Sequence, residues 1–138
     1  MNIKIREITA IPTLMYWRKE VIENVSGEVP SKRLLVEIRR YYRTHIADGT
    51  HIAIVAEADG TDVGCGAICL FDELPSSGNP SGRCACLVNI YVRREYRRRG
   101  IGRTIIKWLV EKARQSGYDK IRFESTDKAC GSSGKVNL

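Results

Sequence analysis

Hydrophobic and polar positions in the first third of the chain follow two different periods. Residues 3–8 (IKIREI) alternate apolar and polar side chains, which is typical of a half-buried β-strand. Residues 12–25 and 32–47 place apolar side chains at three- and four-residue steps, which predicts two amphipathic helices. Ser31 precedes the second of these segments, so we expect its hydroxyl to cap that helix.

The middle of the chain predicts strands. Residues 51–58 and 62–70 are apolar runs joined by Asp59-Gly60-Thr61, and this arrangement indicates a β-hairpin. Residues 71–83 contain two prolines and two glycines, which predicts a loop, and loops of this length tend to be functional or mobile. Residues 84–92 form a third apolar run and predict a buried strand.

The last third of the chain returns to the helical period. Residues 101–116 predict a helix, Gly117 is its C-terminal signal, and residues 118–124 predict one more strand. The order β-α-α-β-β-β-α-β ends in a crossover that requires parallel pairing. We therefore expect an α+β fold with a mixed, mostly antiparallel sheet flanked by helices, as a single domain over residues 1–126 followed by an atypical tail over 127–138.

Length and composition exclude several classes of protein. The 138 residues are 43% hydrophobic and 28% charged, which suits one globular domain and excludes collagen, coiled coils and wholesale disorder. No apolar stretch is long enough to span a bilayer, and the first residues lack the core of a signal peptide, so we expect a cytoplasmic protein without membrane association. Two isolated histidines, and cysteines without CxxC spacing, predict no metal site.

Charge is concentrated in one short segment of this basic chain, whose formal net charge is +7. Six arginines lie within residues 93–103: Arg93, Arg94, Arg97, Arg98, Arg99 and Arg103. Three of them, Arg97, Arg98 and Arg99, open the pattern Arg97-x-x-Gly100-x-Gly102, between a predicted strand and a predicted helix. Helix N-termini offer unpaired N–H groups and a positive dipole, and glycines let a ligand approach the backbone. The segment is therefore either a pyrophosphate-binding turn or a tight structural turn.

This pattern, after LVNIYVRREY and before an amphipathic helix, resembles the coenzyme A signature of the GNAT superfamily of N-acetyltransferases. The order of elements up to about residue 126 is similar to that fold. The resemblance implies acetyl-CoA as co-substrate, no metal, and transfer of the acetyl group to a primary amine of a small molecule or a protein. The coenzyme contacts that it implies are Ile90, Tyr91, Val92, Arg97, Arg98, Arg99, Gly100, Ile101, Gly102, Arg103 and Thr104, with the backbone from Arg98 to Thr104 around the pyrophosphate and Arg97 foremost among the side chains.

The resemblance also implies a bulge in the 84–92 strand, with an N–H near Tyr91 or Val92 polarising the thioester carbonyl. A base must remove a proton from the acceptor ammonium. Glu73 and Asp72 are candidates from their position, and the alternative is that they are solvated loop carboxylates. Asn89 either orients the substrate or a water molecule, or is a buried amide satisfied by neighbouring backbone.

The tail departs from the family pattern. GNAT chains normally continue with a helix that carries a tyrosine, often the acid for the departing thiolate, and then further strands, yet no tyrosine follows Tyr118. Cys130 either stands near the thiolate or is a stray exposed thiol. Missing terminal elements would leave a sheet edge and an apolar face uncovered, so we expect a homodimer. A catalytically impaired coenzyme A-binding protein remains an alternative, as does a nucleic-acid-binding protein, although no nucleic-acid motif accompanies the arginines.

Overall fold

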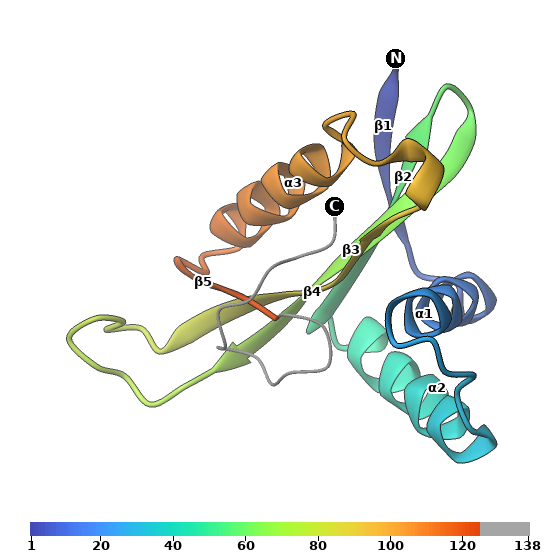
Figure 1. Ribbon diagram of the computed structural model, residues 1–138. Helices are drawn as coiled ribbons and strands as arrows, with labels where there is room; N and C mark the ends of the chain where they lie inside the picture. Colours follow the sequence, from blue (N-terminus) through green and yellow to red (C-terminus); the bar gives the residue numbers. More distant parts are fainter. Residues whose placement is uncertain (125–138) are drawn as a thin grey trace.

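The computed structural model describes residues 1–124, which form one sheet with helices on both faces (Figure 1). The predicted order of elements is confirmed. The elements are β1 (Ile3–Ile8), α1 (Ile11–Val25), α2 (Lys32–Ala47), β2 (His51–Ala58), β3 (Thr61–Asp72), β4 (Arg83–Val92), the 3-10 helix η1 (Arg94–Tyr96), α3 (Ile101–Gln115) and β5 (Lys120–Phe123). The tail over 127–138, including Cys130, lies outside the described residues.

The sheet has the strand order β1-β2-β3-β4-β5. The first four strands pair antiparallel, and β5 pairs parallel to β4 after the crossover through α3. This topology confirms the expected mixed, mostly antiparallel sheet. Ser31 caps α2 as predicted, because its hydroxyl accepts a hydrogen bond from the backbone N–H of Leu34 at 3.1 Å.

Three boundaries differ from the sequence prediction. The β3–β4 hairpin continues through the pairs Phe71↔Cys84 and Asp72↔Arg83, so the loop covers residues 73–82 and not 71–83. Cross-strand pairing thus extends the ladder into polar residues. The last strand begins at Lys120, because the N–H of Tyr118 still donates to the carbonyl of Ala113 at the end of α3 (2.9 Å). The short helix η1 was not predicted.

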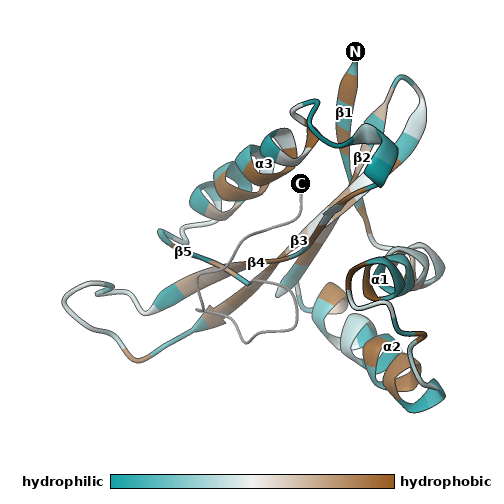
Figure 2. Cartoon of the chain, in the orientation of Figure 1, coloured by the Kyte–Doolittle hydropathy of each residue, from teal (hydrophilic) through white to brown (hydrophobic). Residues whose placement is uncertain are grey.

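Opposite faces of the sheet pack against different helices, as Figures 1 and 2 show. Alternate residues of β2 separate the two cores: Ile54 packs with α3, while Val55 packs with α1. The α3 side is the larger core, and Ile105 and Leu109 of that helix are fully buried in it. Burial of these apolar faces is the main force that holds the helices against the sheet.

A glycine in β3 fixes the position of α3. A Cβ atom at Gly66 would lie 2.7 Å from Cγ2 of Ile105 and 3.0 Å from Cδ1 of Leu109, so a larger residue would push the helix away. The close approach places the N-terminus of α3 near the end of β4 (Figure 1). The loop between these two elements is the segment in which the arginines lie.

Candidate active site

A β-bulge interrupts β4 where it pairs with β3. Between the pairs Ala67↔Val88 and Cys65↔Tyr91, β3 advances two residues while β4 advances three. Asn89 takes up the extra length with a φ of 57°, in the left-handed region that asparagine tolerates better than most residues. The structure therefore contains a bulge where the family resemblance implied one.

Within residues 1–124, no strand pairs with one edge of β4 after the bulge, and we call this the open edge. β5 pairs with β4 only as far as Leu87, whose carbonyl also accepts a hydrogen bond from the N–H of Glu124 at 3.0 Å. On the other edge, the N–H of Arg93 donates to the carbonyl of Val63 in β3 at 2.8 Å. Because peptide groups alternate along a strand, the N–H and carbonyl of Val92 face the open edge. Consistent with this direction, Nε of Arg97 donates to the Val92 carbonyl at 2.8 Å.

Residues 97–104, which we call the arginine turn, join the open strand to α3. Gly100 is the N-cap of α3 with a φ of 82°, and no side chain caps the helix. The first backbone bond of the helix runs from the N–H of Thr104 to the carbonyl of Gly100 at 3.1 Å. The N–H groups of residues 101–103 precede that bond and point out of the helix start. The prediction that the N–H of Thr104 binds a phosphate is wrong, because this N–H donates to the Gly100 carbonyl within the helix.

The structure divides the six arginines into two groups. Arg93 is an anchor: its Nε and Nη2 donate to the two carboxylate oxygens of Glu20 at 2.8 and 3.0 Å, and its guanidinium lies over the Trp17 ring. The hydrogen bonds to Glu20 raise the pKa of Arg93 further above its ordinary value. Four others are exposed: Arg94, Arg98, Arg99 and Arg103.

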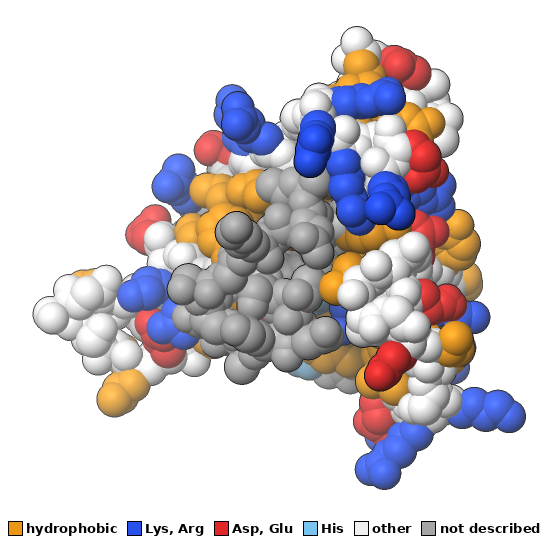
Figure 3. All heavy atoms as spheres, viewed as in Figure 1, with side chains coloured by type: hydrophobic (Ala, Val, Ile, Leu, Met, Phe, Trp, Pro, Cys, Tyr) orange, Lys and Arg blue, Asp and Glu red, His pale blue; other side chains and the backbone are white. Residues whose placement is uncertain are grey.

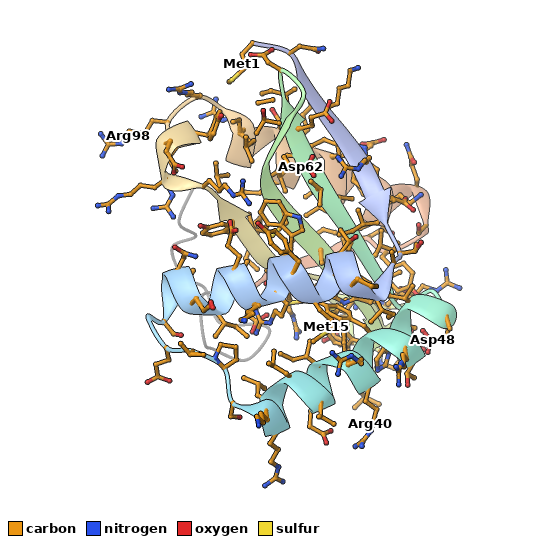
Figure 4. The ribbon with its side chains drawn as sticks, turned by 90° about the vertical axis from the view of Figure 1, so that its right-hand side faces the viewer. Met1, Met15, Arg40, Asp48, Asp62 and Arg98 are labelled. Atoms are coloured by element: carbon orange, nitrogen blue, oxygen red, sulfur yellow. The ribbon has the colours of Figure 1, made fainter. Side chains whose placement is uncertain are left out.

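Exposed basic side chains gather around the arginine turn. Figure 3 shows Lys and Arg side chains over the loop that precedes α3, and Figure 4 shows Arg98 extending away from the body of the protein. Arg97 lies between the two groups, because it is partly buried and bonded to Val92. The turn therefore combines free guanidinium groups with an uncapped helix start, an arrangement suited to a phosphate group.

A cavity of about 360 Å³ lies on the other side of the bulge, under α1 and α2. Asn89 joins it to the open strand, since its Oδ1 accepts a hydrogen bond from Nη1 of Arg18 at 2.9 Å. Side chains from α1, α2, β2, β3 and β4, and from the residue after β5, line this cavity: Arg18, Glu37, Ile38, Tyr41, Tyr42, His51, Cys69, Val88, Asn89 and Glu124. We call it the β4 cavity.

An uncharged cluster forms one wall of the β4 cavity. The hydroxyl of Tyr41 lies 2.9 Å from Nδ1 of His51 and 3.2 Å from Sγ of Cys69. Burial lowers the pKa of His51 to about 4 and raises the pKa values of Tyr41 and Cys69. All three groups are therefore neutral near pH 7, and none of them is an ionised base or nucleophile.

The predicted catalytic residues are not all brought together. Asn89 is at the bulge, and the Tyr91 side chain is buried against Trp17 and Cys65 beneath α1. Glu73 lies beyond the far end of β4, where Asp72 pairs with Arg83. The separation from Arg83 to Asn89 is six residues of strand, or about 20 Å.

The Glu73 carboxylate also makes two contacts with neighbouring side chains. Its carboxylate accepts a hydrogen bond from Nδ2 of Asn79 at 3.0 Å and forms an ion pair with Nη2 of Arg122 at 2.6 Å. The Asn79 hydrogen bond and the Arg122 charge lower the pKa of Glu73. Its role as a base stays a prediction, and these contacts argue against it.

The sequence did not predict two charged residues of the β4 cavity, Arg18 and Glu124, as site residues. Arg18 follows the buried Trp17 and belongs to a helix rich in charged residues, so no local signal marks it. Glu124 is the last residue of the predicted 118–124 strand, and no motif marks it as a site residue. Among residues 1–124, no helix is long and apolar enough to cross a membrane, and no group of three or more His, Cys, Asp or Glu side chains is placed to hold a metal ion.

Comparison with known proteins agrees with this geometry. The family model described as "Acetyltransferase (GNAT) family" matches residues 15–131. The fold is similar to a predicted acetyltransferase from Clostridium acetobutylicum, solved with acetyl-CoA (21% identity, 99% of this chain and 97% of that chain, TM-score 0.81). It is also similar to a GCN5-related N-acetyltransferase from Ralstonia eutropha JMP134 (15% identity, 99% of both chains, TM-score 0.76).

A third similar structure is glucosamine-6-phosphate N-acetyltransferase from Arabidopsis thaliana (17% identity, 100% of this chain and 96% of that chain, TM-score 0.64). No curated protein matches the sequence. At these identities the solved structures establish the fold, while the family model covers more than half of the chain.

Proposed function

The chain belongs to the acetyltransferase (GNAT) family of acyltransferases, and we propose that it moves the acetyl group of acetyl-CoA to a primary amine by direct attack. The acceptor is a small molecule or a protein amine. The observation that carries the proposal is the bulge at Asn89, which lies between the open edge of β4 and the β4 cavity. A donor along the strand and an acceptor in the cavity would meet there.

Coenzyme binding is assigned to the arginine turn and the open strand. The diphosphate would accept hydrogen bonds from the N–H groups of residues 101–103, with Arg97, Arg98 and Arg99 supplying charge. The pantetheine arm would pair with peptide groups of Ile90 and Val92 that face the open edge of β4, as an added strand does. Support comes from the direction of the Val92 carbonyl and from the uncapped start of α3.

The reaction requires a neutral amine beside the thioester. The amine nitrogen attacks the carbonyl carbon, the C–N bond forms, and the C–S bond breaks as the thiolate of coenzyme A departs. A backbone N–H at the open edge, that of Val92, would stabilise the negative charge that develops on the carbonyl oxygen. Tyr91 would contribute its buried ring to the position of this strand.

The proton of the acceptor ammonium needs a base, since such groups have pKa values near 10.4. Two carboxylates of the described residues, Glu37 and Glu124, line the β4 cavity, and Glu124 is the one held directly against β4, through the bond from its N–H to the Leu87 carbonyl. We assign the proton transfer to Glu124, directly or through water. It lies at the point where β5 leaves β4.

Two measurements test the proposed function. Calorimetric titration should show saturable binding of acetyl-CoA, while binding to a short DNA duplex should be weak and lost at higher salt. Release of free thiol should follow when acetyl-CoA is mixed with a panel of amines. Coenzyme binding without release on any amine would support the impaired-enzyme alternative, and tight duplex binding without coenzyme binding would support the nucleic-acid alternative.

A further inference from the structure

The β4 cavity contains a guanidinium for which the described part of the chain supplies no carboxylate partner. Arg18 lines the cavity and is partly buried. Its Nη1 donates to the neutral amide oxygen of Asn89, and among residues 1–124 no carboxylate lies within ion-pair distance of it. A guanidinium carries five N–H donors in a planar fork that matches a carboxylate. A partly buried cation of this kind favours a ligand that brings the missing negative charge.

Within residues 1–124, the remaining lining of the cavity offers an anion no second cation, and its two other charged residues are the carboxylates Glu37 and Glu124. Tyr41, His51 and Cys69 form the uncharged cluster described above, and Ile38 and Val88 add apolar surface. No lysine lines the cavity, and Arg18 is its one arginine among the described residues. A singly charged carboxylate therefore matches this site better than a phosphate group, whose second charge would have no partner.

The position of Arg18 limits where the anionic group can be in the acceptor. Because Asn89 links Arg18 directly to the bulge, an anion on Arg18 would lie close to the carbonyl that is attacked. Its carboxylate and its amine must then be separated by only one or two carbon atoms. Glu124 lines the same cavity and would attract the ammonium end of such a molecule.

We propose that the acceptor is a small amino carboxylate, an α- or β-amino acid, whose carboxylate binds the guanidinium of Arg18 while its amine faces the thioester. This inference rests on the proposed acetyl transfer and names its substrate class. The cavity volume of about 360 Å³ accommodates a molecule of this size. Arg18 is then a specificity-determining residue.

Matched acceptors test the proposal by thiol release from acetyl-CoA. Alanine, methionine and phenylalanine are each compared with their carboxamide and with the decarboxylated amine. The carboxylate of an amino acid holds its ammonium pKa above the 7.7–8.0 of an α-amino group next to an amide. Intrinsic reactivity at pH 7.5 thus favours the carboxamide, and any preference for the amino acid over the carboxamide comes from the protein. We expect kcat/KM to be at least about 10-fold higher for the amino acids.

Variants of Arg18 test whether this residue causes the preference for amino acids. Arg18→Gln should lower kcat/KM for the amino acids by about 10- to 100-fold and leave the amines within about 2-fold, so the selectivity collapses. Arg18→Lys should keep part of it, because a lysine retains the charge without the fork. Lys19→Gln removes the same charge from the next, exposed position of α1 and should keep the wild-type selectivity. Acetyl-CoA affinity, measured by calorimetry, shows whether each variant is folded.

Three results would overturn the inference. The first is an equal or better rate with carboxamides, peptide N-termini or aminophosphonates. The second is an equal loss on all acceptors in Arg18→Gln, which would mean that Arg18 acts only by holding Asn89. The third result applies if no amine is acetylated, so that the proposed function fails. Binding is then measured by calorimetry on the protein loaded with coenzyme A, and amino acid binding no tighter than carboxamide binding would overturn the inference.

Discussion

The two halves of the candidate site are built in different ways. The arginine turn is one continuous segment, residues 97–104, whose backbone and side chains present positive charge to solvent. The β4 cavity is assembled from side chains between Arg18 and Glu124, which meet only because α1, α2, three strands and the residue after β5 come together beside the bulge. A local segment can bind a group common to many ligands, such as a diphosphate. A dispersed cavity can be tuned to one acceptor without altering that segment.

The division predicts that changes in each half affect different steps. Substitutions in the arginine turn should weaken coenzyme binding, and substitutions around the cavity should change turnover or acceptor choice. Asn89 belongs to both halves, because its backbone forms the bulge and its side chain holds Arg18. Four pairs of variants below test this separation, and a fifth pair tests stability near the cavity.

The largest effect is expected from Gly100→Glu. A Cβ at Gly100 meets nothing within 4 Å, so the added side chain has space and places a negative charge at the helix start. Calorimetry should show acetyl-CoA affinity reduced by at least about 100-fold. Gly100→Asn is the control, since asparagine tolerates the φ of 82° without adding charge. Unchanged affinity in the glutamate variant would falsify the assignment of this turn.

Asn89→Val should have the next largest effect, on kcat. A β-branched residue is strained at a φ of 57°, so the bulge would flatten and redirect the peptide groups beside it. We expect kcat to fall by about 100- to 1,000-fold, the loss that follows removal of an oxyanion donor. Asn89→Gly keeps the backbone conformation and should retain most of kcat. Equal losses in both variants would mean that the amide side chain, and not the bulge, is what matters.

Glu124→Gln and Glu73→Gln form a matched pair of carboxylates near the two ends of the β4–β5 ladder. If Glu124 receives the proton, its removal should lower kcat by about 100-fold and abolish the acidic limb of the pH–rate profile. Glu73→Gln should leave kcat within about 3-fold, since its carboxylate is bound to Asn79 and Arg122. The reverse result would restore Glu73 as the base and remove the cavity from the proton transfer.

Arg97→Ala should weaken acetyl-CoA binding by about 1 to 3 kcal/mol, if its guanidinium contacts a phosphate while Nε holds the Val92 carbonyl. Arg94→Ala removes the same charge from an exposed residue of η1 and should change the affinity by less than about 0.5 kcal/mol. Equal changes in the two variants would show that positive charge attracts acetyl-CoA in general and that Arg97 makes no specific contact with a phosphate.

The smallest effect concerns stability near the β4 cavity. His51 is protonated in the folded protein only below a pKa of about 4, whereas an unfolded histidine binds a proton near pH 6.5. Its stabilising contribution is therefore complete above pH 6.5 and is lost as the pH falls toward 4. Urea unfolding at pH 7 and 4.5 should show a loss about 2 kcal/mol greater in wild type than in His51→Gln. His45→Gln should keep most of the wild-type difference, because burial lowers the pKa of His51 more than the His45 charge does.

The same contrast explains how much the sequence predicts. The arginine turn depends on local spacing and on a helix that begins at Ile101, so the pattern of residues 84–116 was sufficient to predict it. The sequence did not predict which of the six arginines of residues 93–103 are exposed, because Arg93 bonds to Glu20, which is 73 positions away along the chain. Extension of the β3–β4 ladder to Asp72 and Arg83 depends on pairing that residue composition does not reveal.

The β4 cavity is harder to predict from the sequence than the arginine turn. Arg18 is one of many charged residues on amphipathic helices, and only the packing of α1 against β4 brings it to Asn89. Glu73 shows the converse: it is a loop carboxylate with a plausible position, and the fold pairs it with Arg122. Periodicity predicts which face of an element is buried, but not which polar groups meet there.

A crystal structure of the complex with acetyl-CoA tests the central claim most directly. The account predicts that the diphosphate lies against the N–H groups of residues 101–103, that the pantetheine follows β4, and that the thioester carbonyl lies at the bulge facing the β4 cavity. An empty arginine turn, or a thioester on the side of the sheet away from that cavity, would contradict it.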